Sequence, residues 1–282
     1  RRRLKGAVYI KLGRPVVIEP KPEATADALG ASIMRELSSN RIVTSTALVA
    51  MALLSEPRHA LTEKDFRERL DIYLRLLTES GALLSPLIRN HKKEAVETVI
   101  EQFIMQGLVE HKLSPRPYYI IDAEKRTELD FLKNTAMDRL FCISVGAHVS
   151  DKAGYNIMMK LFSRTMPVPA TDFDKLTPLQ NGTRKAAAAL SSPLFDAARL
   201  VVEQFMMKKP PAPKRFVKEA LSVGKDLLKL GELSYPESIS KPTIEEIVSG
   251  LADMGYVQAR KKRWEINREG LKRVLGILEP IS

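Results

Sequence analysis

Cysteine, histidine and glycine-rich motifs are scarce in this chain, and each absence excludes a class of site. The 282 residues contain one cysteine, Cys142, and four histidines. A single cysteine excludes an internal disulfide and a cysteine-based metal cluster. His91, His111 and His148 have no second histidine or cysteine at ligand spacing, so we predict no metal site. Neither a Walker loop nor a dinucleotide fingerprint is present, so the sequence predicts no bound nucleotide or other cofactor.

Long apolar runs are missing as well. The most apolar window, residues 42–54, contains Thr44, Ser45 and Thr46 and is shorter than the roughly 18 uninterrupted apolar residues of a membrane span. It therefore predicts a buried core helix. The sequence begins at Arg1 without an initiator methionine or an apolar segment behind the leading arginines. We therefore expect no signal peptide, and we expect the chain to be a piece of a longer protein.

Positive charge, in contrast, is abundant. The net charge is +11 and the isoelectric point is near 9.6, so the surface should attract the phosphates of nucleic acids or of anionic lipid headgroups. Charge alone does not distinguish these partners. The candidate residues for contact with phosphate or anionic lipid are Arg1, Arg2, Arg3, Lys208, Lys209, Lys214 and Arg215. A further basic cluster, residues 260–263, lies in a predicted turn.

Helical periodicity covers most of the chain. Apolar residues recur at helical spacing over residues 24–37, 62–80, 91–106, 131–161, 194–206, 216–230 and 244–254. With 44% apolar residues, this pattern predicts a mainly α, bundle-like globular fold. Short strands follow two of the helices, and Gly107 and Gly255 stand at the two junctions. Helix, glycine, strand, loop and strand is the outline of a winged helix, so we predict two winged-helix-like units and a weak internal duplication.

The opening segment is the exception to this helical pattern. Residues 8–18 predict one β-strand with no nearby partner, and an isolated strand cannot satisfy its own backbone groups. Prolines and changes of composition divide the chain into four predicted regions. These regions are 1–20, a strand and loop; 21–166, a helical region with the first winged-helix-like unit; 167–190, a linker and connecting segment; and 191–282, a helical region ending in the second unit.

One histidine and carboxylate pair has a spacing close to that of a catalytic dyad. In a His-x4-Asp dyad the imidazole removes a hydroxyl proton and the carboxylate orients the ring. His59 and Asp65 are separated by five residues rather than four. Asp65 also lies near a predicted helix start, where a carboxylate stabilises the helix end. We therefore interpret Asp65 as a capping residue.

A basic winged helix is also compatible with DNA binding. The cluster at residues 260–263 lies in the wing, where phosphate contact is expected. The helix that would enter the major groove carries Glu245, Glu246 and Asp253, and these acidic residues oppose phosphate. The pattern therefore favours packing and disfavours nucleic acid as a partner. From the residues alone, two functions remain as alternatives to any enzyme assignment. They are a DNA-binding or chromosome-associated protein and a helical interaction scaffold.

Four segments of the chain carry a resemblance to a known family. They are GAVYIKLGRPVVIEP, TALVAMALLSEPRHALTEKDFRERLDIYLRLL, ELDFLKNTAMDRLFCISVGA and LGELSYPESISKPTIEEIVSGLADMGYV. In this order they resemble the C-terminal region of the PlsB-type glycerol-3-phosphate acyltransferases. Leu12, Thr135 and Asp138 stand where that family commonly has Phe, Asn and His. No role tied to that histidine is therefore carried over.

The resemblance implies an acyltransferase whose catalytic groups lie N-terminal to this chain. The catalytic His-x4-Asp, the phosphate-contacting arginine and the acyl-acceptor motif of the family precede the opening strand. That strand would be the last strand of an α/β acyltransferase domain, so residues 1–20 would be its remnant. We expect this fragment alone to be inactive. Without the rest of the sheet, Val8, Ile10 and Leu12 should be exposed or lie against the helices.

The resemblance also implies a reaction and its partners. The full-length enzyme would transfer an acyl group from acyl-CoA or acyl carrier protein to the sn-1 hydroxyl of glycerol 3-phosphate, the first step of phospholipid synthesis. The related dihydroxyacetone phosphate acyltransferases share the architecture and are an alternative. The expected partners are the protein's own N-terminal acyltransferase domain and an anionic membrane surface. We expect a peripheral protein at the cytoplasmic face of the inner membrane, with no cofactor beyond the thioester co-substrate.

Overall fold

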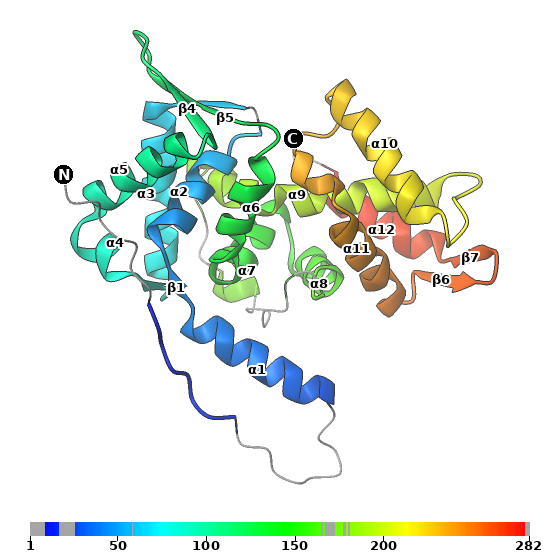
Figure 1. Ribbon diagram of the computed structural model, residues 1–282. Coiled ribbons are helices and arrows are strands. Elements are labelled where there is room, and N and C mark those ends of the chain that lie inside the picture. Colours follow the sequence, from blue (N-terminus) through cyan, green and yellow to red (C-terminus); the bar gives the residue numbers. More distant parts are fainter. Residues whose placement is uncertain are drawn as a thin grey trace.

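The computed structural model describes residues 9–16, 26–57, 59–164, 166, 173–176, 179 and 181–279. Helices make up most of this part of the chain, and the strands between them are short (Figure 1). The mainly α fold predicted from the sequence is confirmed. Within the described residues, no helix combines the length and the apolar character needed to cross a membrane.

The first described segments lie at the edge of the molecule. Residues 9–16 form no strand, so the described part of the predicted strand is not formed. A strand needs a neighbour for its backbone groups, and none of the described strands pairs with this segment. Ile10 and Leu12 are 83% and 89% exposed, which confirms the expectation for these two side chains. Helix α1 (Ala26–Asn40) follows and lies below the other helices in Figure 1.

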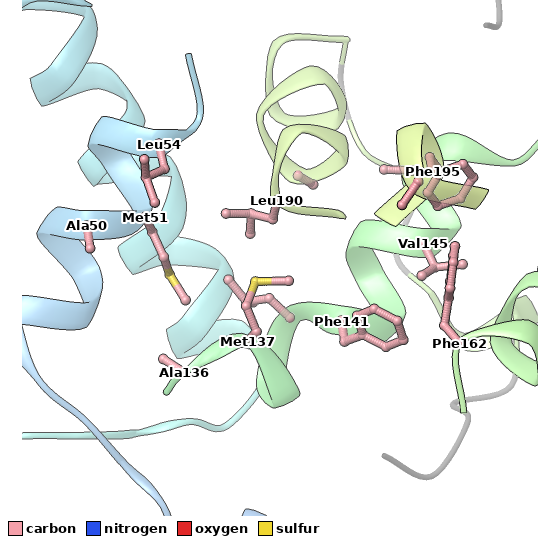
Figure 2. Packing of buried hydrophobic residues seen from close by; sticks show 14 of the residues in the cluster. Ala50, Met51, Leu54, Ala136, Met137, Phe141, Val145, Phe162, Leu190 and Phe195 are labelled. Atoms are coloured by element: carbon pink, nitrogen blue, oxygen red, sulfur yellow. The ribbon is translucent and has the colours of Figure 1, made fainter. Parts of the chain in front are cut away.

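Helix α2 (Ser45–Leu54) is the centre of the core, as the apolar window predicts. Almost every side chain of α2 is buried. The helices packed around it are α3 (Glu63–Glu79), α5 (Lys92–Met105) and α6 (Arg126–Asn134). Figure 2 shows Met51 of α2, Leu190 of α9 (Asn181–Met206) and side chains of α7 (Met137–His148) in one shared core. This core therefore continues from α2 through α7 to α9.

The described strands form three small sheets. Their bounds are β1 (Ile42–Val43), β2 (Ala60–Thr62), β3 (Leu83–Leu84), β4 (Val109–Lys112), β5 (Tyr118–Ile121), β6 (Val257–Arg260) and β7 (Arg263–Ile266). β1 and β3 pair in parallel, β2, β5 and β4 form an antiparallel sheet in that order, and β6 and β7 form a hairpin. Both predicted hairpins are confirmed, and β2 is an unpredicted third strand beside the first. The winged-helix identity of the two units stays a prediction.

Helix ends follow the local chemistry that the sequence indicates. The Thr62 hydroxyl accepts the backbone N–H of Asp65 (3.1 Å) and donates to the Asp65 carboxylate (2.7 Å). This geometry confirms the capping interpretation of Asp65. Gly107 and Gly255 have φ angles of 67° and 71°, the left-handed backbone that favours glycine after a helix. They lead the chain from α5 and from α11 (Lys241–Asp253) into the two hairpins.

Helix α9 begins earlier than the sequence predicts. It starts at Asn181 and continues through Pro193, although proline lacks the N–H of a helical hydrogen bond. Neighbouring side chains stabilise the turn before this proline. Backbone carbonyls in that turn accept hydrogen bonds from Tyr73 of α3 and from Ser144 and His148 of α7. Tertiary contacts therefore outweigh the local preference of proline.

Helix α9 connects the helices that precede it in the chain with those that follow it. It packs against α3 and α7 and also against α11 and α12. It runs through the predicted boundary between residues 167–190 and 191–282, although the four-region division itself stays a prediction. The remaining elements are α4 (Pro86–Asn90), α8 (Lys152–Leu161), η1 (Phe173–Lys175), α10 (Phe216–Leu230), η2 (Pro236–Ile239) and α12 (Arg268–Leu278).

Candidate functional site

The loop between α9 and α10 carries four of the residues predicted to contact anions. Three prolines interrupt the helical pattern here, because each lacks an N–H and restricts the residue before it. Lys208, Lys209, Lys214 and Arg215 therefore lie outside the helices, and all four are exposed. Arg215 is the N-cap residue of α10, and its Nε lies 2.9 Å from Oε1 of Glu219.

An aromatic cluster fixes this loop against the second hairpin. The indole N–H of Trp264 in β7 donates to the carbonyl of Pro211 (2.9 Å). The Trp264 ring packs edge-on against Phe205 and Phe216, with ring centroids 5.0 and 5.6 Å away. Arg268 donates to two carbonyls at the end of α9 (3.2 and 3.3 Å). The loop and the hairpin are therefore held as one unit.

The turn of this hairpin contributes four more cations. Arg260 and Arg263 pair across the hairpin, and Lys261 and Lys262 form the exposed turn between them. In Figure 1 the loop, drawn in yellow, and the hairpin, drawn in orange to red, project from the same end of the molecule. We define the basic tip as Lys208, Lys209, Lys214, Arg215, Arg260, Lys261, Lys262 and Arg263.

Few carboxylates compensate the charge of the basic tip. Glu219 pairs with Arg215, and Glu265 pairs with Arg260 at 2.9 Å. The hydrogen bond from Arg260 lowers the pKa of Glu265 and raises the pKa of Arg260. The six other cations have no ion-pair partner among the described residues. Such a concentration of unpaired positive charge attracts phosphates without needing a pocket.

The structure brings together two clusters that the sequence presents separately. The loop cluster and the turn cluster are about 50 residues apart in the chain, and Trp264 joins them through a contact that spans 53 residues. One sequence feature could have indicated this convergence, namely the single tryptophan beside the basic turn at residues 260–263. An indole needs apolar packing and an acceptor for its N–H, so Trp264 can be expected to contact another segment of the chain. Arg1, Arg2, Arg3 and Val8 lie outside the described residues, so their predicted roles stay predictions.

A groove between α3 and α5 has a different charge balance. Its volume is about 500 Å³, and its lining includes the apolar side chains Phe66 and Leu70. Arg67 at its rim pairs with Glu63 (2.6 Å), and Lys92 pairs with Asp71. The lining carries three cations, Arg67, Lys92 and Lys93, and three carboxylates, Asp71, Glu97 and Glu101. The groove therefore has no excess of positive charge to attract an anion.

The possible catalytic pair is not organised for proton transfer. The Asp65 carboxylate accepts the Thr62 hydroxyl at the start of α3. His59 is exposed, and its backbone carbonyl accepts the N–H of Ile121 (2.7 Å). In the described part of the chain, no group of His, Cys, Asp and Glu side chains has the geometry to hold a metal ion.

Sequence reasoning missed a buried charge pair. Arg126, the first residue of α6, and Glu237 of η2 lie 2.6 Å apart between Nε and Oε1, and their side chains are only 1% and 6% exposed. Another nitrogen of Arg126 donates to the backbone carbonyl of Glu56 (3.1 Å). An arginine in the first turn of a helix usually faces water, so its sequence position gave no signal of burial.

Two further side chains with little exposure fix α7 and α3 to α9. His148 donates through Nε2 to the carbonyl of Ala188 (2.8 Å), and its ring stacks on Phe195 with centroids 3.9 Å apart. Burial lowers the pKa of His148 to about 4, so the ring is neutral at pH 7. The Tyr73 hydroxyl donates to Ala186 (2.8 Å), and burial raises its pKa. We call Arg126, Glu237, Tyr73 and His148 the buried joint.

Comparisons with known proteins give one family match. A family model described as the glycerol-3-phosphate acyltransferase C-terminal region matches residues 3–149 and 159–260. These residues include the loop between α9 and α10, all of α10 and the first strand of the second hairpin. No curated protein matches the chain.

Proposed function

The chain belongs to the glycerol-3-phosphate acyltransferase C-terminal region family, and from this premise we propose that it supports the catalytic domain of a glycerol-3-phosphate 1-O-acyltransferase at an anionic membrane. The resemblance to the PlsB-type enzymes is confirmed, and it makes the full-length protein an acyltransferase. The membrane role is supported by one observation above all: two basic clusters distant in sequence meet in the basic tip.

The reaction itself belongs to the catalytic domain in this proposal. A histidine there takes the proton of the sn-1 hydroxyl of glycerol 3-phosphate while an aspartate orients the imidazole. The resulting alkoxide attacks the thioester carbonyl of acyl-CoA or acyl carrier protein. The C–S bond breaks, the thiolate leaves and takes the proton, and the acyl group remains on the acceptor oxygen. The present chain positions that domain at the surface where its product enters the bilayer.

The charge of the basic tip is large enough for membrane attachment. A lysine or arginine near an anionic leaflet contributes about 1 kcal/mol. If half of the eight cations engage lipid, the gain is about 4 kcal/mol, or roughly a thousandfold in partition. This attraction is screened within about 10 Å at 0.1 M salt, so the attachment should be salt-sensitive and reversible.

Vesicle sedimentation tests the membrane role. The chain should sediment with vesicles of phosphatidylcholine and phosphatidylglycerol at low salt and remain in solution with phosphatidylcholine alone. The variant K208Q/K209Q/K214Q/R215Q should bind the anionic vesicles about thirtyfold more weakly, because half of the four charges removed would engage lipid at about 1 kcal/mol each. Equal binding of the unmodified chain to both kinds of vesicle, or to neither, contradicts the proposal.

Turnover measurements test the division of labour between the two parts. The 282-residue chain alone should not consume glycerol 3-phosphate and acyl-CoA. The full-length protein should do so, and it should prefer glycerol 3-phosphate to dihydroxyacetone phosphate. Activity of the chain alone would place the active site within it and overturn the supporting role.

A further inference from the structure

One face of helix α10 is a row of lysines. Lys218, Ser222, Lys225 and Lys229 recur at intervals of four, three and four residues, the spacing that places side chains on one face of a helix. All four are exposed. With a rise of about 1.5 Å per residue, the three lysines extend over about 16 Å. We call these three lysines the α10 row.

The packing of α10 turns this row directly away from the protein. Phe216, Ala220 and Gly224 are the buried residues of the helix, and they lie on the face opposite the row. Gly224 allows the closest approach, because a Cβ at this position would clash with the side chains of Ile239 and Leu200. The helix is therefore seated firmly on η2 and α9, and its lysines project outward.

The acidic residues of α10 do not interrupt the row. Glu219 pairs with Arg215 (2.9 Å), and Asp226 lies 3.6 Å from Lys229. Both acidic residues lie on one flank of the row, about a quarter turn away. From residue 207 to residue 230 the chain has seven basic and two acidic side chains, a net charge of +5 out of +11 for the whole protein. The positive charge is therefore concentrated in this segment.

The row also continues the basic tip. Lys214 and Arg215 belong to the tip and directly precede the first turn of α10. In Figure 1 the helix extends from that end of the molecule along its outer edge. A straight, outward-facing row that begins at an anion-binding surface suits a planar array of anionic headgroups better than an isolated ion.

From this geometry we infer that α10 lies along the membrane surface and that the α10 row is a second line of contact with anionic lipid headgroups. The inference rests on the proposed function, because it extends the membrane contact of the basic tip. A flat bilayer accommodates a row of about 16 Å along its whole length. The flank opposite the acidic residues carries the half-buried Val217, Leu221 and Leu228, which can settle at the level of the headgroups.

A matched pair of variants tests the row. K218Q/K225Q/K229Q removes three charges from α10, and glutamine preserves helix propensity. K64Q/K93Q/K185Q removes three exposed charges from α3, α5 and the beginning of α9. On phosphatidylglycerol-containing vesicles the α10 variant should bind on the order of a hundredfold more weakly than the unmodified chain. The control variant should lose several-fold at most.

A fluorescent label tests the orientation, which charge removal alone does not. Ser222 lies within the row and Glu97 is exposed on α5, so S222C and E97C offer two labelling positions, whereas the native Cys142 is buried. An environment-sensitive label at S222C should shift to the blue on anionic vesicles and be quenched by nitroxide headgroup lipids. The label at E97C should change little. Equal responses from both positions overturn the inference.

The outcomes separate this inference from the proposed function. If the unmodified chain ignores anionic vesicles, the proposed function fails and the inference fails with it. If the chain binds and the tip variant is impaired, but the α10 variant equals its control, the inference alone fails. The chain could also bind duplex DNA more tightly than anionic vesicles at the same salt. If only the α10 variant then loses DNA binding, the row is a nucleic-acid surface and the inference is overturned.

Discussion

The buried joint and the basic tip each contain an arginine–glutamate ion pair, but one pair is buried and the other is exposed. Arg126 of the joint lies 2.6 Å from Glu237, and Arg215 of the tip lies 2.9 Å from Glu219. The two distances are similar, yet the Arg126 side chain is 1% exposed and the Arg215 side chain is 76% exposed. The geometry of an ion pair therefore does not reveal its role, whereas burial does.

The difference follows from solvation. A charge pair removed from water pays a desolvation penalty, and loss of one partner leaves the other charge buried and uncompensated. A pair in water gains little, and its arginine can exchange the carboxylate for another anion at almost no cost. The joint is therefore suited to holding α6 and η2 together, and the tip is suited to reversible contact with anions.

Breaking the buried pair should have the largest effect. Arg126→Ala leaves Glu237 buried without its cation, so we expect the free energy of unfolding to fall by about 3 to 5 kcal/mol. Arg215→Ala, the matched change at the tip, should cost no more than about 0.5 kcal/mol. Urea unfolding followed by circular dichroism measures both. Equal losses for the two variants would show that burial does not separate the two pairs.

Acid should weaken the joint through His148. The pKa of its ring is about 4 in the folded protein and near 6.5 in an unfolded chain. A lowered folded-state pKa means that the stabilisation is complete above pH 6.5 and is lost as pH falls toward 4. The full loss is about 3 kcal/mol. H148Q should flatten the pH dependence of unfolding free energy between these limits, and an unchanged slope would exclude His148 as its source.

Removing the indole N–H should have an intermediate effect at the tip. Trp264→Phe preserves an aromatic ring beside Phe205 and Phe216 but cannot donate to the carbonyl of Pro211. We expect a loss of about 1 kcal/mol in unfolding free energy together with weaker vesicle binding, because the loop and the hairpin are then less firmly joined. If Trp264→Phe bound vesicles as tightly as the unmodified chain, the loop cluster and the turn cluster would contact lipid without needing to be fixed together.

Removing the charges of the loop should change stability least. K208Q/K209Q/K214Q/R215Q alters exposed side chains in irregular chain, so its unfolding free energy should stay within about 0.5 kcal/mol of the unmodified protein. Its vesicle binding should nevertheless fall sharply. A large loss of stability would mean that the tip is part of the folded framework and would remove the contrast with the joint.

Local patterns predicted most of the secondary structure. Helical spacing located the core helix and the amphipathic helices, and Gly107 and Gly255 marked the turns into the hairpins, because a left-handed residue after a helix favours glycine. Thr62 and Asp65 marked a helix start for an equally local reason. The same reasoning placed residues 167–190 in a linker and missed the start of α9 at Asn181, since the contacts that stabilise this part of the helix come from α3 and α7.

Long-range contacts explain what the sequence did not predict at the candidate site. Arg126 and Glu237 are 111 residues apart, and Trp264 and Pro211 are 53 residues apart. No periodicity links residues at such separations, and each looks ordinary within its own segment. The charged residues of the tip were therefore predictable one cluster at a time, whereas their convergence and the burial of Arg126 depended on the fold.

Trp264 also gives the molecule a built-in optical label. It is the one tryptophan among the 282 residues, and from β7 it packs against the end of α9 and the beginning of α10. Emission excited selectively from indole therefore originates at the basic tip and nowhere else in the chain. Docking of this end onto a surface can therefore be followed in the native protein by the emission wavelength and the fluorescence lifetime of Trp264.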